Sequence, residues 1–336
     1  MNHNERLLQN WFVASTSHEL RTKPLARTIL DTPLVLFRSQ GKPVVLLDRC
    51  PHRNAPLAAG KVVGGTIQCP YHGWRFDVDG ACVFRPGSPH ASEDKYCDNK
   101  MFQSVERNGL VWVNLSESAS EATLPKTSWS SDPLFASFIW TSRIQAEFVD
   151  AIENLLDATH TPFVHSGLVR TAEKSQKFRA TVRVRDSFVE AEYHDEGKQS
   201  GWVSQLFERD RASSFGRFVP PCIAELEYTS RRGTEFVLNS HFTPETSEEL
   251  QVYSVFFVRR TRIPTTIKRV LLGPFFRRIL NQDRHILRLQ QDNIRRFGRT
   301  DFRYWEGDLL RPLIETWMQE GEFPTDHSEQ MVELEL

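Results

Sequence analysis

Two short segments, each holding one cysteine and one histidine, constrain this chain of 336 residues more than any other feature. Cys50 and His52 form a C-x-H pair, and Cys69 and His72 form a C-x2-H pair after sixteen intervening residues. Thiolate and imidazole together suit zinc or the iron of an iron–sulfur cluster. Zinc ribbons usually pair cysteine with cysteine in C-x2-C knuckles, and C-x-H is too tight for that geometry. The pattern predicts two loops that share one metal centre, and it favours an iron–sulfur cluster over structural zinc.

Charge and hydropathy exclude several classes of function. The 42 basic residues against 43 acidic ones give a net charge of -1, which argues against nucleic acid as a partner. No apolar stretch approaches the roughly 18 residues of a membrane helix. The first ten residues lack a hydrophobic run like that of a signal peptide, and five cysteines fit a reducing compartment better than a disulfide framework. We therefore expect a cytoplasmic protein without a membrane span.

The two halves of the chain differ in their periodicity. Before residue 118, β-forming segments at 34–38 and 44–47 alternate with turns, and Asn108-Gly109 is a strong hairpin signal. Later, strand-like segments occur at 180–184, 224–228, 235–242 and 251–258, with helical period over 147–159 and 279–297. We expect an α+β protein: a mostly antiparallel β domain over 1–118, and a domain over 119–336 with a sheet crossed by one or two helices.

A second set of metal-capable side chains lies at the helical stretch 147–159. At about 100° per residue, Glu153, Asp157 and His160 fall within about 60° of one another. An amphipathic surface helix with a solvated polar face would show the same pattern. His165, just past Pro162, adds a second imidazole from a chain that has turned. Two histidines and one carboxylate leave open positions on an iron ion, so a third ligand is expected from elsewhere.

The later helix, 279–297, offers that carboxylate. Asp283 falls inside its apolar stripe, about 40° from Ile279. The stripe comprises Ile279, Ile286, Leu287, Ile294 and Phe297. An unpaired carboxylate on a buried face would cost roughly several kcal/mol, which metal ligation would remove. The alternative is a buried salt bridge to an arginine of this region, whereas Asp292 lies about 160° from the stripe centre and is expected to be solvated.

The first cluster, together with the Gly73-Trp74 that follows it, resembles the Rieske [2Fe-2S] motif. The resemblance implies that Cys50 and Cys69 hold one iron, while His52 and His72 hold the other. Neutral imidazole in place of thiolate raises the reduction potential of such a cluster. Residues 1–118 are then expected to form a Rieske domain.

Together, the cysteine–histidine cluster and the second set of metal-capable residues resemble the catalytic α component of Rieske non-haem iron oxygenases, and the resemblance covers nearly the whole chain. The family pattern acid-x3-D-x2-H-x4-H is met by Glu153, Asp157, His160 and His165. The segment 281–286 is similar to the family's E-D-K/R-x-I/V segment, although Gln282 departs from the acidic residue common there. The resemblance implies a helix-grip (START-like) catalytic domain over 119–336, in which His160, His165 and Asp283 hold mononuclear Fe(II).

Two further roles follow from this resemblance. Asp157 would connect the two metal sites for electron transfer, by contacting an iron-ligand histidine of its own subunit and a cluster-ligand histidine of the neighbour. A carboxylate on an imidazole N–H also fixes the ring tautomer and raises its basicity. Asn154 would line the iron site, with a helix-surface amide as the alternative.

The segment 27–33 and the short length look like the vanillate and dicamba demethylase group, which has only α subunits, usually in a ring of three. The resemblance implies a monooxygenase that takes O2, and electrons from NAD(P)H through a reductase or ferredoxin, to hydroxylate or demethylate a small, aromatic substrate. An electron carrier with a non-catalytic binding domain is the first alternative, and a zinc-ribbon binding protein is the second. About three Fe per chain would indicate the oxygenase and about two the carrier.

Overall fold

The computed structural model describes residues 6–88, 97–117, 119–125, 128–166, 177–194, 211–262, 264–298, 301–325 and 329–335. The chain forms two compact units, one of Met1–Lys126 with Thr243–Ser247, the other of Thr127–Phe242 with Glu248–Leu336. Residue 118, at the expected domain boundary, lies outside the described residues. The limits at 118 and 119 therefore stay a prediction.

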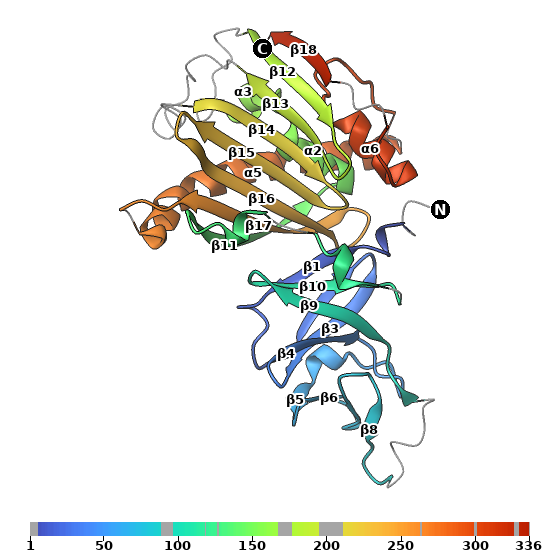
Figure 1. The fold of residues 1–336 in the computed structure, drawn as a ribbon. Helices are drawn as coiled ribbons and strands as arrows, with labels where there is room; N and C mark the ends of the chain where they lie inside the picture. The colour runs from blue at the N-terminus through green and yellow to red at the C-terminus, as the bar shows by residue number, and fades with distance from the viewer. Residues whose placement is uncertain are drawn as a thin grey trace. The chain divides into compact units, whose positions relative to one another are not determined.

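The first unit contains two antiparallel sheets (Figure 1). The order of the larger sheet is β1-β10-β9-β4-β3-β2. Its strands are β1 (Trp11–Thr16), β2 (Leu25–Ile29), β3 (Thr32–Ser39), β4 (Lys42–Leu47), β9 (Met101–Arg107) and β10 (Leu110–Asn114). The smaller sheet runs β5 (Lys61–Val63), β6 (Thr66–Gln68), β7 (Arg75–Phe76) and β8 (Cys82–Phe84), after the short 3-10 helix η1 (Leu57–Ala59).

The hairpin predicted at Asn108-Gly109 joins β9 to β10. Both residues have positive φ, 55° and 79°, as the two central residues of a type I′ turn require. The mostly antiparallel β prediction for this part of the chain is confirmed.

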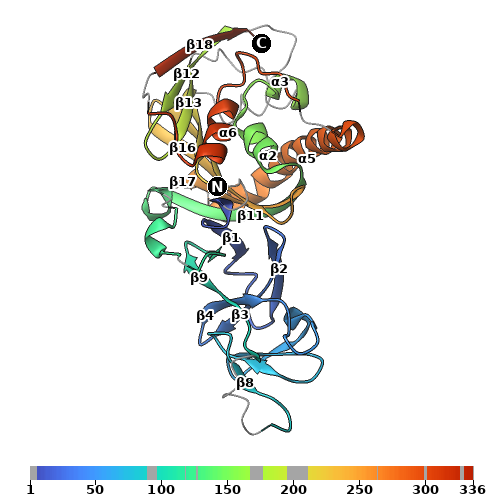
Figure 2. The same cartoon turned by 90° about the vertical axis from the view of Figure 1, so that its right-hand side faces the viewer.

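The second unit is built on an eight-stranded sheet of order β11-β17-β16-β15-β14-β13-β12-β18. Its strands are β11 (Phe135–Gln145), β12 (Lys177–Val184), β13 (Val189–His194), β14 (Arg211–Val219), β15 (Ile223–Ser230), β16 (Gly233–Pro244), β17 (Glu249–Arg259) and β18 (Glu329–Glu335). Its α-helices are α2 (Phe148–Leu156), α3 (Thr161–Val164), α5 (Thr265–Phe297) and α6 (Arg311–Glu320). The views in Figures 1 and 2 place α2, α5 and α6 on one side of the sheet. The α+β prediction is confirmed, whereas β11, β13, β14, β18 and α6 were not predicted.

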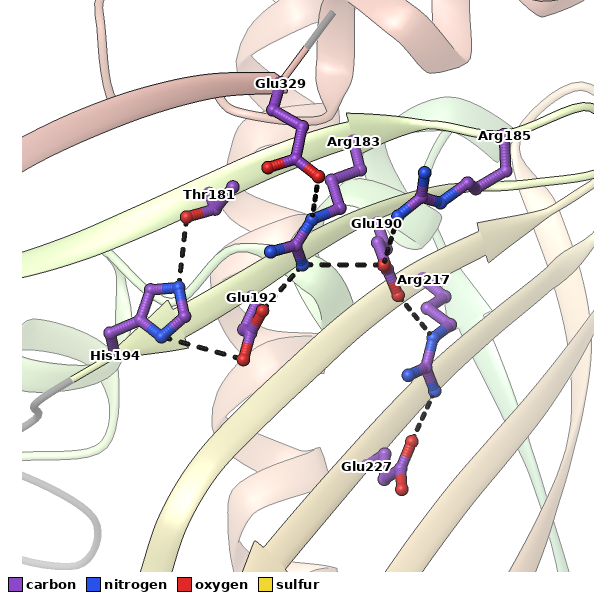
Figure 3. A network of polar contacts seen from close by, with 9 residues as sticks. All are labelled: Thr181, Arg183, Arg185, Glu190, Glu192, His194, Arg217, Glu227 and Glu329. Atoms are coloured by element: carbon purple, nitrogen blue, oxygen red, sulfur yellow. Dashed lines mark hydrogen bonds and ion pairs between the residues drawn. The ribbon is translucent and has the colours of Figure 1, made fainter. Parts of the chain in front are cut away.

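The two faces of this sheet differ in chemistry because side chains alternate along each strand. On the helix side, the Tyr193 hydroxyl donates to the Leu156 carbonyl oxygen at 3.1 Å, and Gly216 leaves room for the same residue. Polar side chains next to Tyr193 and Gly216 in sequence, such as Glu192 and Arg217, point to the opposite face of the sheet. There they belong to a polar network (Figure 3). In it Arg217 donates to Glu190 at 2.9 Å and to Glu227 at 2.6 Å. The same face also carries Thr181, Arg183, Arg185, Glu192 and His194.

Helix α5 begins fourteen residues before the predicted start at 279, and it continues through Pro274. A proline inside a helix removes one backbone hydrogen bond and crowds the preceding turn, so sequence pattern alone favours a later start. Gly273, which is buried, lies where an added Cβ would be 3.6 Å from the Trp140 ring. Packing of the helix on β11 therefore supports the turn that the proline weakens.

The predicted apolar stripe of α5 is wrong in part. Ile286 and Phe297 are 40% and 65% exposed, so they do not lie on a buried face. The buried positions of this part of the helix are Leu287 and Gln291, and Asp283 precedes them at the same spacing of four. Asp283 thus still lies on the inward line of the helix. Asp292 is exposed, as predicted, and pairs with Arg295 at 3.2 Å.

None of the described helices combines the length and the apolar character that crossing a bilayer requires.

Candidate metal centres

The first centre rests on two loops with the same backbone pattern. The amide of each cysteine donates to the carbonyl oxygen five residues later, and the amide four residues later returns a bond to the cysteine carbonyl. These bonds are Cys50 to Ala55 (2.9 Å), Cys69 to Trp74 (2.8 Å), Asn54 to Cys50 (2.8 Å) and Gly73 to Cys69 (3.2 Å). Each cysteine therefore occupies the same position in a closed loop, one following β4 and the other joining β6 to β7.

Both loops need a left-handed residue at the same place. Asn54 has φ of 59° and Gly73 has φ of 73°. Glycine enters this region freely, and asparagine does so more readily than most other residues. The sequence therefore places a suitable residue four positions after each cysteine.

The loops bring the four predicted cluster ligands together. Cys50 and Cys69 are both 1% exposed, within the core cluster of this unit. Burial raises the pKa of the Cys50 thiol to about 11, and the neighbouring Cys69 adds to the shift. A thiol of this kind stays protonated at neutral pH unless a metal cation replaces the proton.

The two histidines of this centre lie against each other. The ring centroids of His52 and His72 are 4.5 Å apart. Trp74 stacks on His52, with 4.6 Å between centroids and 3° between ring planes. Nδ1 of His52 is buried without a hydrogen-bond partner within the part of the chain that the structure describes. An imidazole nitrogen left in this way fits a metal ligand.

The arrangement of these four residues does not suit a single ion. In tetrahedral zinc sites with bonds of about 2.0–2.3 Å, ligand atoms lie about 3.5 Å apart. Among the described residues, the only group of three or more His, Cys, Asp or Glu that could surround one ion is His160, His165 and Asp283. Two cysteines and two histidines on two matching loops are the ligand set of a Rieske-type [2Fe-2S] cluster, so we expect that cluster here rather than zinc.

The second centre forms where α2 ends and α3 begins. The sequence predicted one helix to residue 159, but α2 ends at Leu156, and Asp157 has extended backbone angles, φ -76° and ψ 115°. The Thr159 amide then donates to Asp157 Oδ1 at 2.6 Å. The prediction that Asp157 and His160 share a helical face is therefore wrong; a turn stabilised by the aspartate side chain brings them together.

Helix α3 holds the two histidines at its ends. His160 precedes the helix and His165 follows it, with Pro162 in the first turn. Proline is favoured there because the N–H groups of the first turn have no acceptor within the helix, so its lack of an N–H costs no hydrogen bond. Pro162 therefore lies in the first turn of a short helix that the sequence pattern did not predict.

Three side-chain atoms converge at this centre. Asp283 Oδ1 is 3.0 Å from His165 Nε2 and 3.5 Å from His160 Nε2, and the two Nε2 atoms are 3.2 Å apart. Adjacent ligands of an octahedral ion with bonds of about 2.1 Å lie about 3 Å apart. The triangle therefore has the size of one face of an octahedron. Two histidines and one carboxylate in this form are typical of non-haem Fe(II).

Electrostatics at this centre favour a cation. Burial opposes a charge on His160, but the carboxylates of Asp157 and Asp283 raise its pKa to about 9. Burial also acts to raise the pKa of Asp283, yet the contacts with His160 and His165 bring it below its usual range. Asp283 Oδ1 is buried and has no well-formed hydrogen bond among the described residues. The three side chains fit a divalent metal ion.

Of the two other predicted site residues, Asp157 lies beside this triangle. Asp157 Oδ2 is 3.5 Å from His160 Nδ1, an electrostatic contact on the side of the ring away from Asp283. Asn154 lies half-buried on α2, and none of the contacts found among described residues joins it to the two histidines or Asp283. Its role at the iron stays a prediction.

Sequence reasoning missed Arg311, at the start of α6. Its guanidinium donates to Asp150 at 2.8 Å, to Glu315 at 2.9 Å and to Glu153. Gln290 of α5 donates to the other oxygen of Asp150 at 3.1 Å. Arg311 thus neutralises the acidic side of α2 and links it to α6, while Gln290 links α5 to the same aspartate. The Pro312 that follows Arg311 marks a helix start, but nothing in the sequence pairs this arginine with α2.

Glu153 makes the stability of the second unit depend on pH. Burial raises its pKa to about 7, against the opposing effect of Arg311. Because the folded state holds the Glu153 proton more tightly than the unfolded state, this group stabilises the fold. Its contribution to the free energy of unfolding is complete below about pH 4.5 and is lost as the pH rises to about 7. Glu153→Gln is expected to remove this fall, at most about 3 kcal/mol. Urea unfolding at pH 5 and pH 8 measures it. Glu320→Gln, at an exposed position of α6, is the control; equal pH slopes in the Glu153→Gln variant and the wild type would contradict the assignment.

Comparison with known proteins adds two family matches. Residues 10–96 match the Rieske [2Fe-2S] domain, and residues 144–306 match the vanillate O-demethylase oxygenase C-terminal domain. The oxygenase component of dicamba O-demethylase from Stenotrophomonas maltophilia is 35% identical over 54% of this chain and 54% of its own length. A methylxanthine N1-demethylase from Pseudomonas putida is 33% identical over 45% and 43%. In sequence, the chain matches about half the length of these relatives.

Similarity in structure covers more of the chain. The crystal structure of dicamba monooxygenase bound to dicamba matches 93% of this chain and 98% of its own, with a TM-score of 0.79 and 25% identity. With the two centres above, these matches define a class: the chain belongs to the Rieske non-haem iron oxygenases, with a Rieske [2Fe-2S] domain followed by an oxygenase C-terminal domain. Within that class, its second domain is of the vanillate O-demethylase type.

Proposed function

We propose that this protein is the terminal oxygenase component of a monooxygenase system that hydroxylates or oxidatively demethylates a small, aromatic compound. The observation that carries the proposal is the buried triangle of His160, His165 and Asp283, with edges of 3.0–3.5 Å. Three protein ligands on one face leave the opposite positions of an octahedral ion open. A purely structural metal site would close them.

The residues divide between two cofactors. Cys50, His52, Cys69 and His72 would hold the [2Fe-2S] cluster, and His160, His165 and Asp283 would hold mononuclear Fe(II). The cluster supplies single electrons, and the mononuclear iron supplies activation of O2. His165 is 3% exposed, so the protein around this centre keeps most water away from it.

Asp157 serves as a positioning residue in this proposal. Its Oδ2 faces His160 Nδ1, and the Thr159 amide fixes its other oxygen. A carboxylate at Nδ1 keeps the proton there, so that Nε2 presents its lone pair to the metal. We also propose that Asp157 connects this centre to the Rieske cluster of a neighbouring subunit, in a homotrimer.

Demethylation and hydroxylation need the same chemistry. Insertion of one oxygen atom into a C–H bond of an O-methyl or N-methyl group gives an unstable adduct that releases formaldehyde. The relatives named for dicamba O-demethylation and methylxanthine N1-demethylation point to such substrates here. Electrons would come from NAD(P)H through a reductase or ferredoxin, and we place the system in the cytoplasm, in breakdown of aromatic compounds.

Iron counting tests this proposal directly. Anaerobically purified protein is expected to contain about three Fe and two acid-labile sulfides per chain, with a Rieske-type EPR signal after dithionite reduction. A chelator should remove one Fe and leave the signal. Two Fe that resist chelation would support the electron carrier, and zinc without sulfide would contradict both centres.

A further inference from the structure

The two histidines of the mononuclear centre have different partners at Nδ1. His160 Nδ1 faces the carboxylate of Asp157, whereas His165 Nδ1 lies 3.1 Å from Oε1 of the Gln282 carboxamide. Gln282 precedes Asp283 on α5, and it is half-buried. The helix that supplies the carboxylate of the triangle therefore also supports one of its imidazoles.

The contact with Gln282 determines the tautomer of His165. An amide oxygen only accepts hydrogen bonds, so Nδ1 of His165 must carry the proton. The lone pair of the ring then lies on Nε2, which is 3.0 Å from Asp283 Oδ1 and 3.2 Å from His160 Nε2. This is the form of the ring that can bind a metal ion.

The neutral amide also limits the charge at the centre. The carboxylates of Asp157 and Asp283 contribute two negative charges, which one divalent ion balances. The family segment that residues 281–286 resemble commonly has an acidic residue at this position. A glutamate at 282 would add a third negative charge beside His165, which is 3% exposed. Excess charge in such a poorly solvated place is costly and favours the higher oxidation state of a bound metal.

We infer that Gln282 is a positioning residue of the mononuclear centre: its amide holds His165 in the metal-binding tautomer while leaving the centre without excess negative charge. This rests on the proposed function, and it assigns a role to a residue at which the chain departs from the family pattern. The effect acts through His165, because Oε1 of Gln282 contacts the ring nitrogen opposite to the one in the triangle.

Binding of Co(II) to protein depleted of mononuclear iron tests the hydrogen bond without any measurement of activity. Gln282→Met, which keeps the length of the side chain but removes the acceptor, is expected to weaken Co(II) binding about 10–100-fold. Gln282→Glu restores an acceptor and should bind at least as tightly as the wild type. Asn281→Met and Asn281→Asp, at the exposed neighbouring position, are the matched controls and should bind like the wild type.

The midpoint potential of the mononuclear iron tests the role of charge. Gln282→Glu should lower the potential relative to the wild type, and Asn281→Asp, which adds the same charge outside the centre, should change it much less. Equal shifts in both variants, or Co(II) binding by Gln282→Met as tight as in the wild type, would overturn the inference. A wild-type protein that binds neither iron nor Co(II) at His160 and His165 would instead overturn the proposed iron site.

Discussion

Asp283→Ala is expected to abolish turnover while leaving the Rieske spectrum unchanged. The variant removes one of the three proposed iron ligands, whose Oδ1 lies 3.0 Å and 3.5 Å from the two imidazoles. Losing several kcal/mol of metal binding corresponds to a fall in activity on the order of 1000-fold or more. Iron content should drop from about three to about two per chain, because the cluster ligands belong to the other unit.

Asp292→Ala is the control for this variant. Asp292 lies on the same helix, but it is exposed and, among the described residues, its ion pairs are with Arg288 at 3.8 Å and Arg295 at 3.2 Å. Exposed pairs of this kind contribute at most about 1 kcal/mol, so its activity and iron content should match the wild type. Loss of visible colour in Asp283→Ala would show that the two centres have been assigned wrongly.

Arg311→Met is expected to produce the largest loss of stability. The guanidinium is 9% exposed and lies among the carboxylates of Asp150, Glu153 and Glu315. Removing one partner of a buried ion pair costs about 3–5 kcal/mol, because the remaining charges are left without compensation. For a unit of this size, the melting temperature should fall by about 10 °C.

Differential scanning calorimetry measures this effect, and the Rieske absorbance reports separately on the first unit. Arg288→Met is the matched control, since Arg288 lies on the surface of α5 with 67% of its side chain exposed and should change stability little. The deficit of Arg311→Met should also grow between pH 5 and pH 8, as Glu153 loses its proton. A melting temperature within 2 °C of the wild type, against the roughly 10 °C expected, would contradict the role of Arg311 as the buried counter-ion.

The short spacings of the sequence were enough to predict the first centre. In each of its loops, a cysteine, a histidine two or three residues later and a left-handed residue at the fourth position lie within six residues. Local backbone hydrogen bonds then close the loop around the cysteine. The hairpin at Asn108-Gly109 was predictable for the same reason, because turn geometry depends on the residues of the turn.

For the second centre, the sequence predicted which side chains are present, but the predicted local structure was wrong. His160 and His165 were identified by their type and order, but the inferred helical face does not exist, since α2 ends before Asp157. A side-chain hydrogen bond to the backbone competes with the next helical turn at that point. Periodicity alone does not show such competition.

What the sequence by itself determined is the identity of the metal-capable side chains and the class of chemistry they suit, because these depend on residue type and short spacing. Only the tertiary structure decided which contacts these side chains make with distant parts of the chain. Asp283, which the sequence had already offered, lies 3.0 Å from His165, whereas the contacts of Gln282 with His165 and of Arg311 with α2 were not predicted. These pairings depend on how the sheet and helices pack, and packing energy is summed over many contacts that no local pattern records.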